Sequence, residues 1–320
     1  MIGRAILAAP LLVLAGLAVS APVTAQSSQT QQQPAQPSPG EQILGRILDR
    51  VIGPAPQRQQ PTEPQRPAAA APSMADILAD PRRDGDRARD QYRHPAETLA
   101  FFQVQPGMTV VDYLPANGWF TRIIAPWLGP QGHYIAMGPD LTGETNQYFL
   151  NSMGGLAAKF PGQAAQWNLG ASARLSAFNT DGYPPELDGT VDRVLIFREM
   201  HNQLRFGWLH DDLLTIRRML KPGGMVGIED HRMFENAPYS MTDGNKGYLR
   251  ESDVIELMDV YGFDLVGRSE INANPRDTKD YERGVWALPP GLAGATGSTR
   301  ARMLAIGESD RMTLLFRKRD

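Results

Sequence analysis

Seven short runs of apolar and β-branched residues alternate along the chain with longer segments in which apolar residues recur every three or four positions. The runs have the composition of strands, and they lie at 108–113, 133–137, 174–178, 191–197, 225–229, 263–269 and 312–318. The longer segments have the period of amphipathic helices, and they lie at 118–128, 145–160, 208–220 and 253–261. The alternation continues almost to the C-terminus, so one extended α/β region is expected.

Strands that alternate with helices predict a mostly parallel sheet. We therefore predict an α/β fold with a Rossmann-like sheet of about seven strands and helices on both faces. The last two strands, 263–269 and 312–318, have no long helical segment between them. Parallel neighbours need a long crossover connection, so these two strands are expected to form an antiparallel pair at the C-terminal edge.

The first 25 residues have the three-part pattern of a secretory signal peptide. Arg4 supplies a positive charge, residues 5–19 are apolar, and Val23-Thr24-Ala25 precedes Gln26. The apolar run is shorter than the ~20 residues that span a bilayer, so no membrane association is expected after cleavage. The chain has no cysteine, which excludes disulfides and suits an oxidising compartment. A periplasmic or secreted protein is therefore predicted.

Composition divides the remaining chain into two parts. Residues 26–73 are rich in Gln, Pro, Ala and Ser and poor in aromatic residues, which predicts a disordered tether. Residues 74–320 have the composition of a globular domain and are numerous enough for one large α/β core. The formal net charge of −3 does not indicate a nucleic-acid surface, and the expected partner is a small-molecule substrate.

Polar residues follow the predicted strands at the edge where parallel sheets bind ligands. The candidates for binding a nucleotide-like cofactor are Asp112, Leu114, Asn117, Gly118, Trp119, Asp140, Asn179 and Glu199. The candidates for catalysis are His201, Asp230 and His231. The turn after the first strand has one glycine, Gly118, that permits a close approach of backbone to ligand; an ordinary strand-to-helix turn has the same composition.

Two clusters of histidine and carboxylate residues support more than one chemistry. His201 follows Glu199 after the fourth strand, and His231 follows Asp230 after the fifth. A histidine beside a carboxylate can act as a general base near neutral pH. The same four side chains also suit Zn²⁺ or a similar ion, although the sequence has no short ligand motif such as His-Glu-x-x-His.

The segment 84–95 is dense in Asp and Arg. Charge pairs three and four positions apart predict a solvated helix there. The segment can also fold over the ligand, and Tyr92 and His94 near its end remain candidates for the rim of the site.

Three stretches, in this order, resemble the class I S-adenosylmethionine-dependent methyltransferases. They are Val110-Val111-Asp112, Asp192-Arg193-Val194-Leu195 and Leu220-Lys221-Pro222-Gly223-Gly224. More narrowly, residues 74–320 resemble a group of exported bacterial proteins that are predicted methyltransferases. The matching stretches there include Tyr92-Arg93-His94-Pro95, Asp230-His231-Arg232, Gly284-Val285-Trp286 and Ile306-Gly307-Glu308-Ser309-Asp310-Arg311.

The resemblance implies an enzyme whose cofactor is S-adenosylmethionine. It implies that the loop 112–119 faces the methionine part of the cofactor and that Asp140 faces the ribose. Residues 114–116, Leu-Pro-Ala, stand where the superfamily usually has a Gly-rich run, and an exported protein has no evident supply of this cofactor. Both points favour a weak or lost activity.

The leading hypothesis is an S-adenosylmethionine-dependent methyltransferase whose acceptor is unidentified. The alternatives are a periplasmic small-molecule binding protein on the same scaffold and a metal-dependent hydrolase that uses His201 and His231. For the leading hypothesis, Asp112→Ala and Gly118→Val are expected to abolish cofactor binding while the fold stays largely intact.

Overall fold

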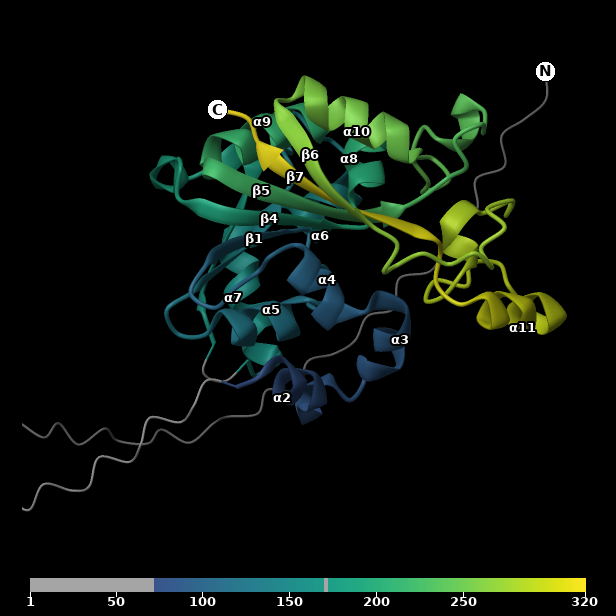
Figure 1. Ribbon diagram of the computed structural model, residues 1–320, viewed down its shortest axis with the longest axis horizontal. Coiled ribbons are helices and arrows are strands. Elements are labelled where there is room, and N and C mark those ends of the chain that lie inside the picture. The colour runs from purple at the N-terminus through teal and green to yellow at the C-terminus, as the bar shows by residue number, and fades with distance from the viewer. Residues whose placement is uncertain (1–71, 170–171) are drawn as a thin grey trace, which may run out of the picture. The chain divides into compact units, whose positions relative to one another are not determined.

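The computed structural model describes residues 72–169 and 172–320. The predicted signal peptide (1–25) lies outside the described residues, as does the predicted tether (26–73) apart from its last two residues. Within the described part, the region predicted to be globular forms a sheet with helices on both faces (Figure 1).

The sheet has seven strands in the order β3-β2-β1-β4-β5-β7-β6. The strands are β1 (Thr109–Tyr113), β2 (His133–Gly138), β3 (Arg174–Asn179), β4 (Val191–Phe197), β5 (Leu220–His231), β6 (Phe263–Ser269) and β7 (Arg311–Lys318). Strands β3, β2, β1, β4 and β5 pair in parallel, whereas β7 is antiparallel to both β5 and β6. The predicted Rossmann-like, mostly parallel sheet with an antiparallel C-terminal pair is confirmed.

The C-terminal pair differs from the prediction in two details. Strand β7 lies between β5 and β6, so only β6 is at the edge. The connection between β6 and β7 also contains a helix, α11 (Gly297–Ile306). Only Met303 and Ile306 of this helix are buried, so it lacks the apolar stripe by which a helix is recognised in a sequence.

The other helices are α2 (Met74–Ala79), α3 (Asp90–Arg93), α4 (Pro95–Phe101), α5 (Thr121–Leu128), α6 (Gln147–Met153), α7 (Leu156–Gln166), α8 (Met200–Phe206), α9 (Leu209–Met219) and α10 (Glu251–Val260). The helix predicted at 145–160 is two helices, because Gly155 between them has a left-handed backbone with φ +65°. The helix predicted to reach Leu220 ends at Met219, because Leu220 already pairs with Val191 in the sheet. None of the helices in the described residues is long and apolar enough to cross a membrane.

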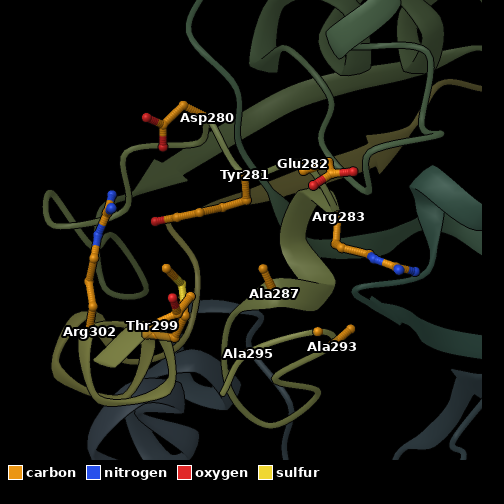
Figure 2. A pocket seen from close by; sticks show the side chains of 11 residues that line it. Asp280, Tyr281, Glu282, Arg283, Ala287, Ala293, Ala295, Thr299 and Arg302 are labelled. Atoms are coloured by element: carbon orange, nitrogen blue, oxygen red, sulfur yellow. The ribbon is translucent and has the colours of Figure 1, made fainter. Parts of the chain in front are cut away.

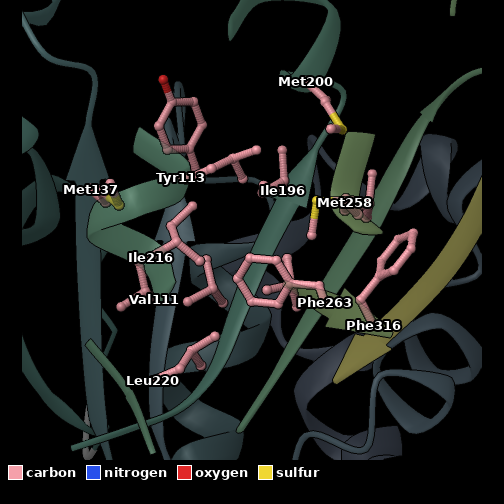
Figure 3. Close-up of a cluster of buried hydrophobic side chains, with 14 of the residues drawn as sticks. Val111, Tyr113, Met137, Ile196, Met200, Ile216, Leu220, Met258, Phe263 and Phe316 are labelled. Carbon is pink, nitrogen blue, oxygen red and sulfur yellow. The ribbon is translucent and has the colours of Figure 1, made fainter. Parts of the chain in front are cut away.

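Alternate residues of each strand build the core on opposite faces of the sheet. Val111 belongs to a buried cluster with Ile216 of α9 and Met258 of α10 (Figure 3). Val110 belongs to a second cluster on the other face, which includes Ile123 of α5. A fully buried side chain of this size contributes about 1.5–3 kcal/mol to folding, so the two clusters fix the strands, and with them the strand ends that carry the polar candidates.

The connection between β6 and β7 reaches the carboxyl ends of the parallel strands. Strand β7 runs antiparallel to β5, and its first residue, Arg311, pairs with the last residue of β5, His231. The chain just before β7, including Glu308 and Ser309, therefore lies at the same end of the sheet as the predicted site.

Candidate functional site

The loop after β1, residues 114–119, has an unusual backbone. Leu114 and Ala116 both have φ +47°, and Gly118 has φ +70°. Left-handed backbone of this kind disfavours residues with a Cβ by about 1–2 kcal/mol each. The loop therefore keeps, at alternate positions, a conformation that suits glycine, although two of the three positions carry side chains.

Asp112 lies at the base of this loop and is fully buried. Its carboxylate accepts a hydrogen bond of 2.6 Å from the Tyr134 hydroxyl, which also lies 2.8 Å from the Thr121 hydroxyl. Burial and, to a smaller extent, the nearby Glu199 carboxyl raise the pKa of Asp112 to about 7, although the hydrogen bond from Tyr134 acts in the opposite direction. At neutral pH Asp112 is therefore a mixture of the neutral and ionised forms.

Replacing Asp112 by asparagine is expected to make stability less sensitive to pH. The carboxyl ionises at its ordinary value of 3.8 when unfolded and near pH 7 when folded, so wild-type stability falls as the pH rises between these values. From pH 5 to pH 8 the wild type should lose about 2–3 kcal/mol relative to Asp112→Asn. Urea unfolding of both proteins at pH 5, 6.5 and 8 measures the difference between their free energies of unfolding. A difference that stays constant with pH would contradict the raised pKa.

A cavity of about 200 Å³, here called the loop cavity, lies beside the loop after β1. Five residues predicted to bind a cofactor line it: Asp112, Leu114, Asn117, Trp119 and Glu199. Three arginines that the sequence analysis did not propose also line it: Arg89, Arg93 and Arg198. The structure thus brings most of the predicted cofactor residues to one cavity and adds positive charge to its wall.

Trp119 holds one of these arginines in place. Two guanidinium groups lie over its ring, that of Arg83 at 5.1 Å and that of Arg93 at 4.6 Å from the ring centroid. The Trp119 Nε1–H donates to the backbone carbonyl of Asp86 at 3.3 Å. Cation–π contacts of this kind are attractive, so Trp119 orients Arg93 as well as bordering the cavity.

Gly118 does not line the loop cavity, and its role is steric. A Cβ at Gly118 would lie 2.6 Å from the ring of Trp167, closer than carbon atoms can approach. Contrary to the expectation from the sequence, the structure predicts that Gly118→Val disturbs the fold, because the side chain would meet this ring and a Cβ disfavours the left-handed backbone.

Asp140 and Asn179 line neither the loop cavity nor the histidine cavity described below. The Asp140 carboxylate accepts from the backbone N–H of Thr142 at 2.7 Å. The buried Asn179 amide donates to two backbone carbonyls and accepts from the N–H of Leu156. These bonds give both side chains a place in the local loop structure, and neither side chain lines a cavity that the other predicted residues line.

A second cavity of about 230 Å³, here called the histidine cavity, adjoins the first. His201, His231 and Asn202 line it, together with Trp286 and three residues that follow it in the connection between β6 and β7: Pro289, Pro290 and Gly291. Arg198, Glu199 and Pro290 line both cavities. The two spaces therefore share one wall, formed by the chain as it leaves β4 and by Pro290 of the connection between β6 and β7.

Asp230, at the end of β5, orients His201. Its carboxylate lies 2.9 Å from His201 Nδ1 and accepts the His201 backbone N–H at 2.9 Å. It also accepts the backbone N–H of His231 at 2.7 Å. A carboxylate can only accept, so the ring donates from Nδ1 and keeps Nε2 as an acceptor. This is the arrangement of an oriented general base.

His231 is held by Ser309, whose Oγ lies 2.5 Å from its Nδ1. The centroids of the His201 and His231 rings are 5.2 Å apart. Burial lowers the pKa of His231 well below its ordinary value, and His201, Arg198, Arg311 and Arg93 lower it further. His231 is therefore a neutral ring in a positively charged environment.

The three catalytic candidates also have the spacing of a metal site. One ligand atom from each of His201, Asp230 and His231 lies within 4.8 Å of the others. Asp230, however, already accepts three N–H groups, and the arginines that act on His231 would repel a divalent cation. The donor types suit a metal but the surrounding charge does not, so these three residues do not favour a metal-dependent reaction.

Glu199 lies in the shared wall. Its carboxylate accepts from the Asn202 amide at 2.6 Å. Burial raises its pKa to about 7, although His201, Asn202 and Arg198 act in the opposite direction. Glu199 and Asp112 are therefore two acids that can each carry or release a proton near neutral pH at the border of the loop cavity.

The segment 84–95 reaches the site, but through other residues than those proposed. Tyr92 packs against Gly307, where a Cβ would lie 2.6 Å from the Tyr92 ring. His94 Nδ1 lies 3.3 Å from the Asn272 side-chain oxygen. Neither lines the two cavities, whereas Arg89 and Arg93 line the loop cavity. The sequence contains one signal for this arginine, because Arg93 lies between Tyr92 and His94 in the stretch Tyr92-Arg93-His94-Pro95 that carries the resemblance.

A larger cavity of about 350 Å³ lies outside this site (Figure 2). It is lined by residues 280–303 of the connection between β6 and β7, among them Tyr281 and Arg302. None of the predicted site residues lines it. Volume alone therefore does not identify the functional site.

Comparison with known proteins finds no matching family model and no matching curated protein. Among solved structures, the chain is similar to a SAM dependent methyltransferase from Aquifex aeolicus, with 18% identity over 62% of this chain and 93% of that one and a TM-score of 0.43. It is also similar to geranyl diphosphate C-methyltransferase from Streptomyces coelicolor A3(2), a complex with Mg²⁺, geranyl diphosphate and S-adenosyl-L-homocysteine. There the identity is 13% over 81% and 86% of the two chains, and the TM-score is 0.46.

A third similar structure is 1,6-didemethyltoxoflavin-N1-methyltransferase from Burkholderia thailandensis, with 14% identity, coverage of 77% and 87%, and a TM-score of 0.42. These structural neighbours are methyltransferases, and at such identities they are likenesses of fold. Because one fold supports many activities, the functional argument rests on the residues described above.

Proposed function

We propose that the protein is an S-adenosylmethionine-dependent methyltransferase of weak activity that acts on a small-molecule acceptor. The observation that carries this proposal is the shared wall between the two cavities. One cavity borders a loop with glycine-like backbone at the end of the first strand. The other contains the base His201, oriented by Asp230. A cofactor and an acceptor bound on either side of Arg198, Glu199 and Pro290 would face each other.

The residues of the loop cavity suit the polar end of the cofactor. Asp112 and Glu199 supply carboxyl groups, and Asn117 supplies an amide. The space of about 200 Å³ is smaller than the ~300 Å³ of the smallest usual ligand sites, because Leu114 and Ala116 contribute side chains to its lining. This is the physical reason to expect weak binding.

The cofactor, when bound, supplies an electrophilic methyl group. The chain supplies orientation, which is the main requirement of an in-line displacement, and a proton acceptor. His201 Nε2 accepts the proton from an oxygen or nitrogen of the acceptor. Asp230 then stabilises the imidazolium through the bond to Nδ1. Burial and neighbouring positive charge keep His231 neutral, so its ring can accept a hydrogen bond from the acceptor.

Calorimetric titration with S-adenosylmethionine and S-adenosylhomocysteine tests the binding step. We expect weak, saturable binding of both. Ala116→Leu should remove it, because a larger side chain then occupies the same cavity without a new demand on the backbone. Absence of binding to the folded wild type would overturn the proposal and favour the small-molecule binding protein.

His201→Gln separates catalysis from binding. Loss of a general base lowers a rate by about 10²–10⁴-fold, so methyl transfer to any acceptor identified should fall by that factor. Binding of S-adenosylhomocysteine should stay within about twofold, because His201 lines only the histidine cavity. Unchanged turnover in this variant would exclude His201 as the base.

A further inference from the structure

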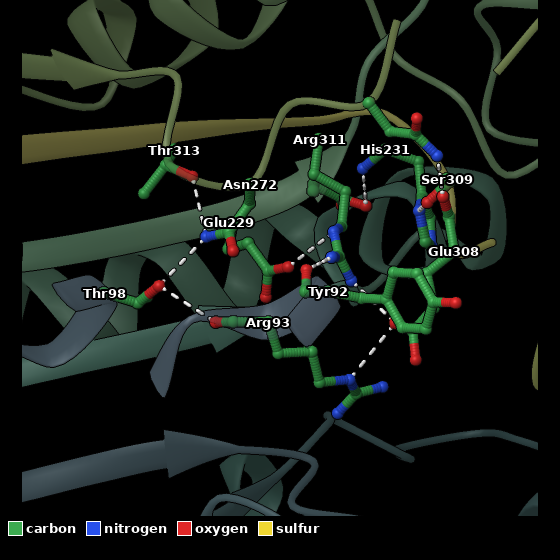
Figure 4. A network of polar contacts seen from close by, with 12 residues as sticks. Tyr92, Arg93, Thr98, Glu229, His231, Asn272, Glu308, Ser309, Arg311 and Thr313 are labelled. Atoms are coloured by element: carbon green, nitrogen blue, oxygen red, sulfur yellow. Dashed lines mark hydrogen bonds and ion pairs between the residues drawn. The ribbon is translucent and has the colours of Figure 1, made fainter. Parts of the chain in front are cut away.

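Four arginines gather around two carboxylates beside the loop cavity. Glu308 lies 2.6 Å from Arg89, 3.2 Å from Arg93 and 2.8 Å from Arg311. Arg311 also lies 2.8 Å from Glu229, without hydrogen-bond geometry. Figure 4 shows Arg93 and Arg311 converging on Glu308. The fourth arginine, Arg198, forms no ion pair with any described residue.

The charges of this group do not balance. Four guanidinium groups are always positive, whereas Glu308 and Glu229 supply two negative charges. Asp112 and Glu199 border the same space, but each is partly protonated near neutral pH because its pKa is about 7. Positive charge held in a buried setting without a counter-charge is unfavourable, so the group has capacity for a further anion.

Two arginine nitrogens are buried without a partner. Arg93 Nη2 and Arg89 Nη2 each have no hydrogen-bond acceptor among the described residues. Arg93 is 3% exposed. Its Nε–H donates to Glu308, and its guanidinium lies over the Trp119 ring. A buried unmade donor is expensive, and both side chains line the loop cavity, so a ligand oxygen that reaches either nitrogen from this cavity would satisfy it.

We propose that Arg89, Arg93 and Arg198 form an anion-binding site for a carboxylate or another oxyanion of a small-molecule ligand. Arginine donors suit such groups because their planar fork matches two oxygens. Arg198 also lines the histidine cavity, so a ligand held here by its anionic group reaches towards His201. The inference uses the cavities of the proposed function, but it does not depend on methyl transfer.

The anion can belong to the methionine end of the cofactor or to the acceptor. Both sources present the same chemistry to the three arginines, and two ligands distinguish them. S-adenosylmethionine carries a carboxylate, whereas its decarboxylated analogue lacks one and is otherwise matched.

Calorimetric titration with sulfate, at constant ionic strength adjusted with chloride, tests the site itself. Sulfate keeps its charge across the pH range of interest, so only the protein titrates. We expect saturable binding to the wild type and at least tenfold weaker binding to Arg198→Met and to Arg93→Met. Arg302→Met is the control, because Arg302 is exposed and lines the other, larger cavity (Figure 2), and its affinity should equal that of the wild type.

Arg198→Met keeps the test decisive if Arg93→Met does not fold, because Arg198 makes no ion pair within residues 72–169 and 172–320 whose loss would leave a carboxylate unpaired. Equal sulfate binding by wild type and Arg198→Met, or none by either, would overturn the proposal. If S-adenosylmethionine binds at least tenfold more tightly than its decarboxylated analogue, and Arg198→Met removes the difference, the anion is that of the cofactor. If sulfate binds but S-adenosylmethionine and its decarboxylated analogue bind equally tightly, the site serves the acceptor. If sulfate binds but neither nucleoside binds, the site also serves the acceptor, and the proposed function fails while this inference stands.

Discussion

Gly118→Ala is expected to lower the free energy of unfolding by about 2–5 kcal/mol, which would make it one of the most damaging single substitutions in the loop after β1. Two effects add. A residue with a Cβ at φ +70° costs about 1–2 kcal/mol, and overpacking a filled space costs about 1–3 kcal/mol. The overpacked neighbour is the Trp167 ring, 2.6 Å from the position of the new carbon.

Gly155→Ala is the matched control for this prediction. Gly155 has nearly the same backbone, φ +65°, but apart from its immediate chain neighbours no described residue has an atom within 4 Å of the position that a Cβ would take. It should therefore show only the backbone effect of about 1–2 kcal/mol. Urea unfolding of the two variants measures the difference, and equal losses would mean that Trp167 yields without cost and that Gly118 is required only for its backbone.

Glu308→Gln is expected to cost about 3–5 kcal/mol, because removing one partner of a buried ion pair leaves uncompensated charge. Glu308 is 3% exposed and pairs with Arg89, Arg93 and Arg311. Glu270→Gln is the control: its side chain is 69% exposed and pairs with Arg232, and a surface pair contributes about 0–1 kcal/mol. If the two variants lose the same stability, the arginine group does not depend on Glu308.

The difference in stability between wild type and Glu308→Gln should also depend on pH. The surrounding arginines hold the pKa of Glu308 at about 2 against the opposing effect of burial, compared with an ordinary value of 4.5. A lowered pKa contributes stability above the unfolded value and loses it as the pH falls towards the folded value. The difference in free energy of unfolding between wild type and Glu308→Gln should therefore be constant above about pH 5 and become smaller as the pH falls below 4.5. Unfolding measured across an acid titration would show this.

The sheet was predictable because its signal is local. Strands β4 and β6 match the predicted runs 191–197 and 263–269 at both ends, since each run is bounded by residues that leave the sheet. Strand β5 (Leu220–His231) extends beyond the predicted run 225–229 at both ends. Lys221-Pro222-Gly223-Gly224 lies within the strand, although Gly, Pro and Lys are depleted in strands, so the apolar run alone gives only part of it.

The site was predictable only where it follows from strand ends. His201, Asp230 and His231 meet because β4 and β5 are adjacent parallel strands, and adjacency follows from the alternation of elements. Arg89 and Arg93 come from a segment outside the sheet, and their partner Glu308 is far along the chain. No periodicity relates such residues, so their meeting depends on the folded path of the whole domain.

Asn179 shows the opposite error. It follows a strand, as a ligand-binding residue would, but its amide is fully used in tying α7 to the loops around it. Position at a strand end is therefore not sufficient to place a residue in the site.

The pairing of Arg93 with Glu308 spans 215 positions of the chain, which has a consequence for the order of folding during synthesis. A chain that emerges from its N-terminus has β1 to β5 available long before Glu308. The apolar faces of those strands can begin to pack, but the arginines that border the loop cavity have no carboxylate at position 308 to meet them. The arginine group can therefore be completed only near the end of synthesis, and a nascent chain that stalls before Glu308 would expose a sheet whose proposed ligand-binding end is still open and cationic.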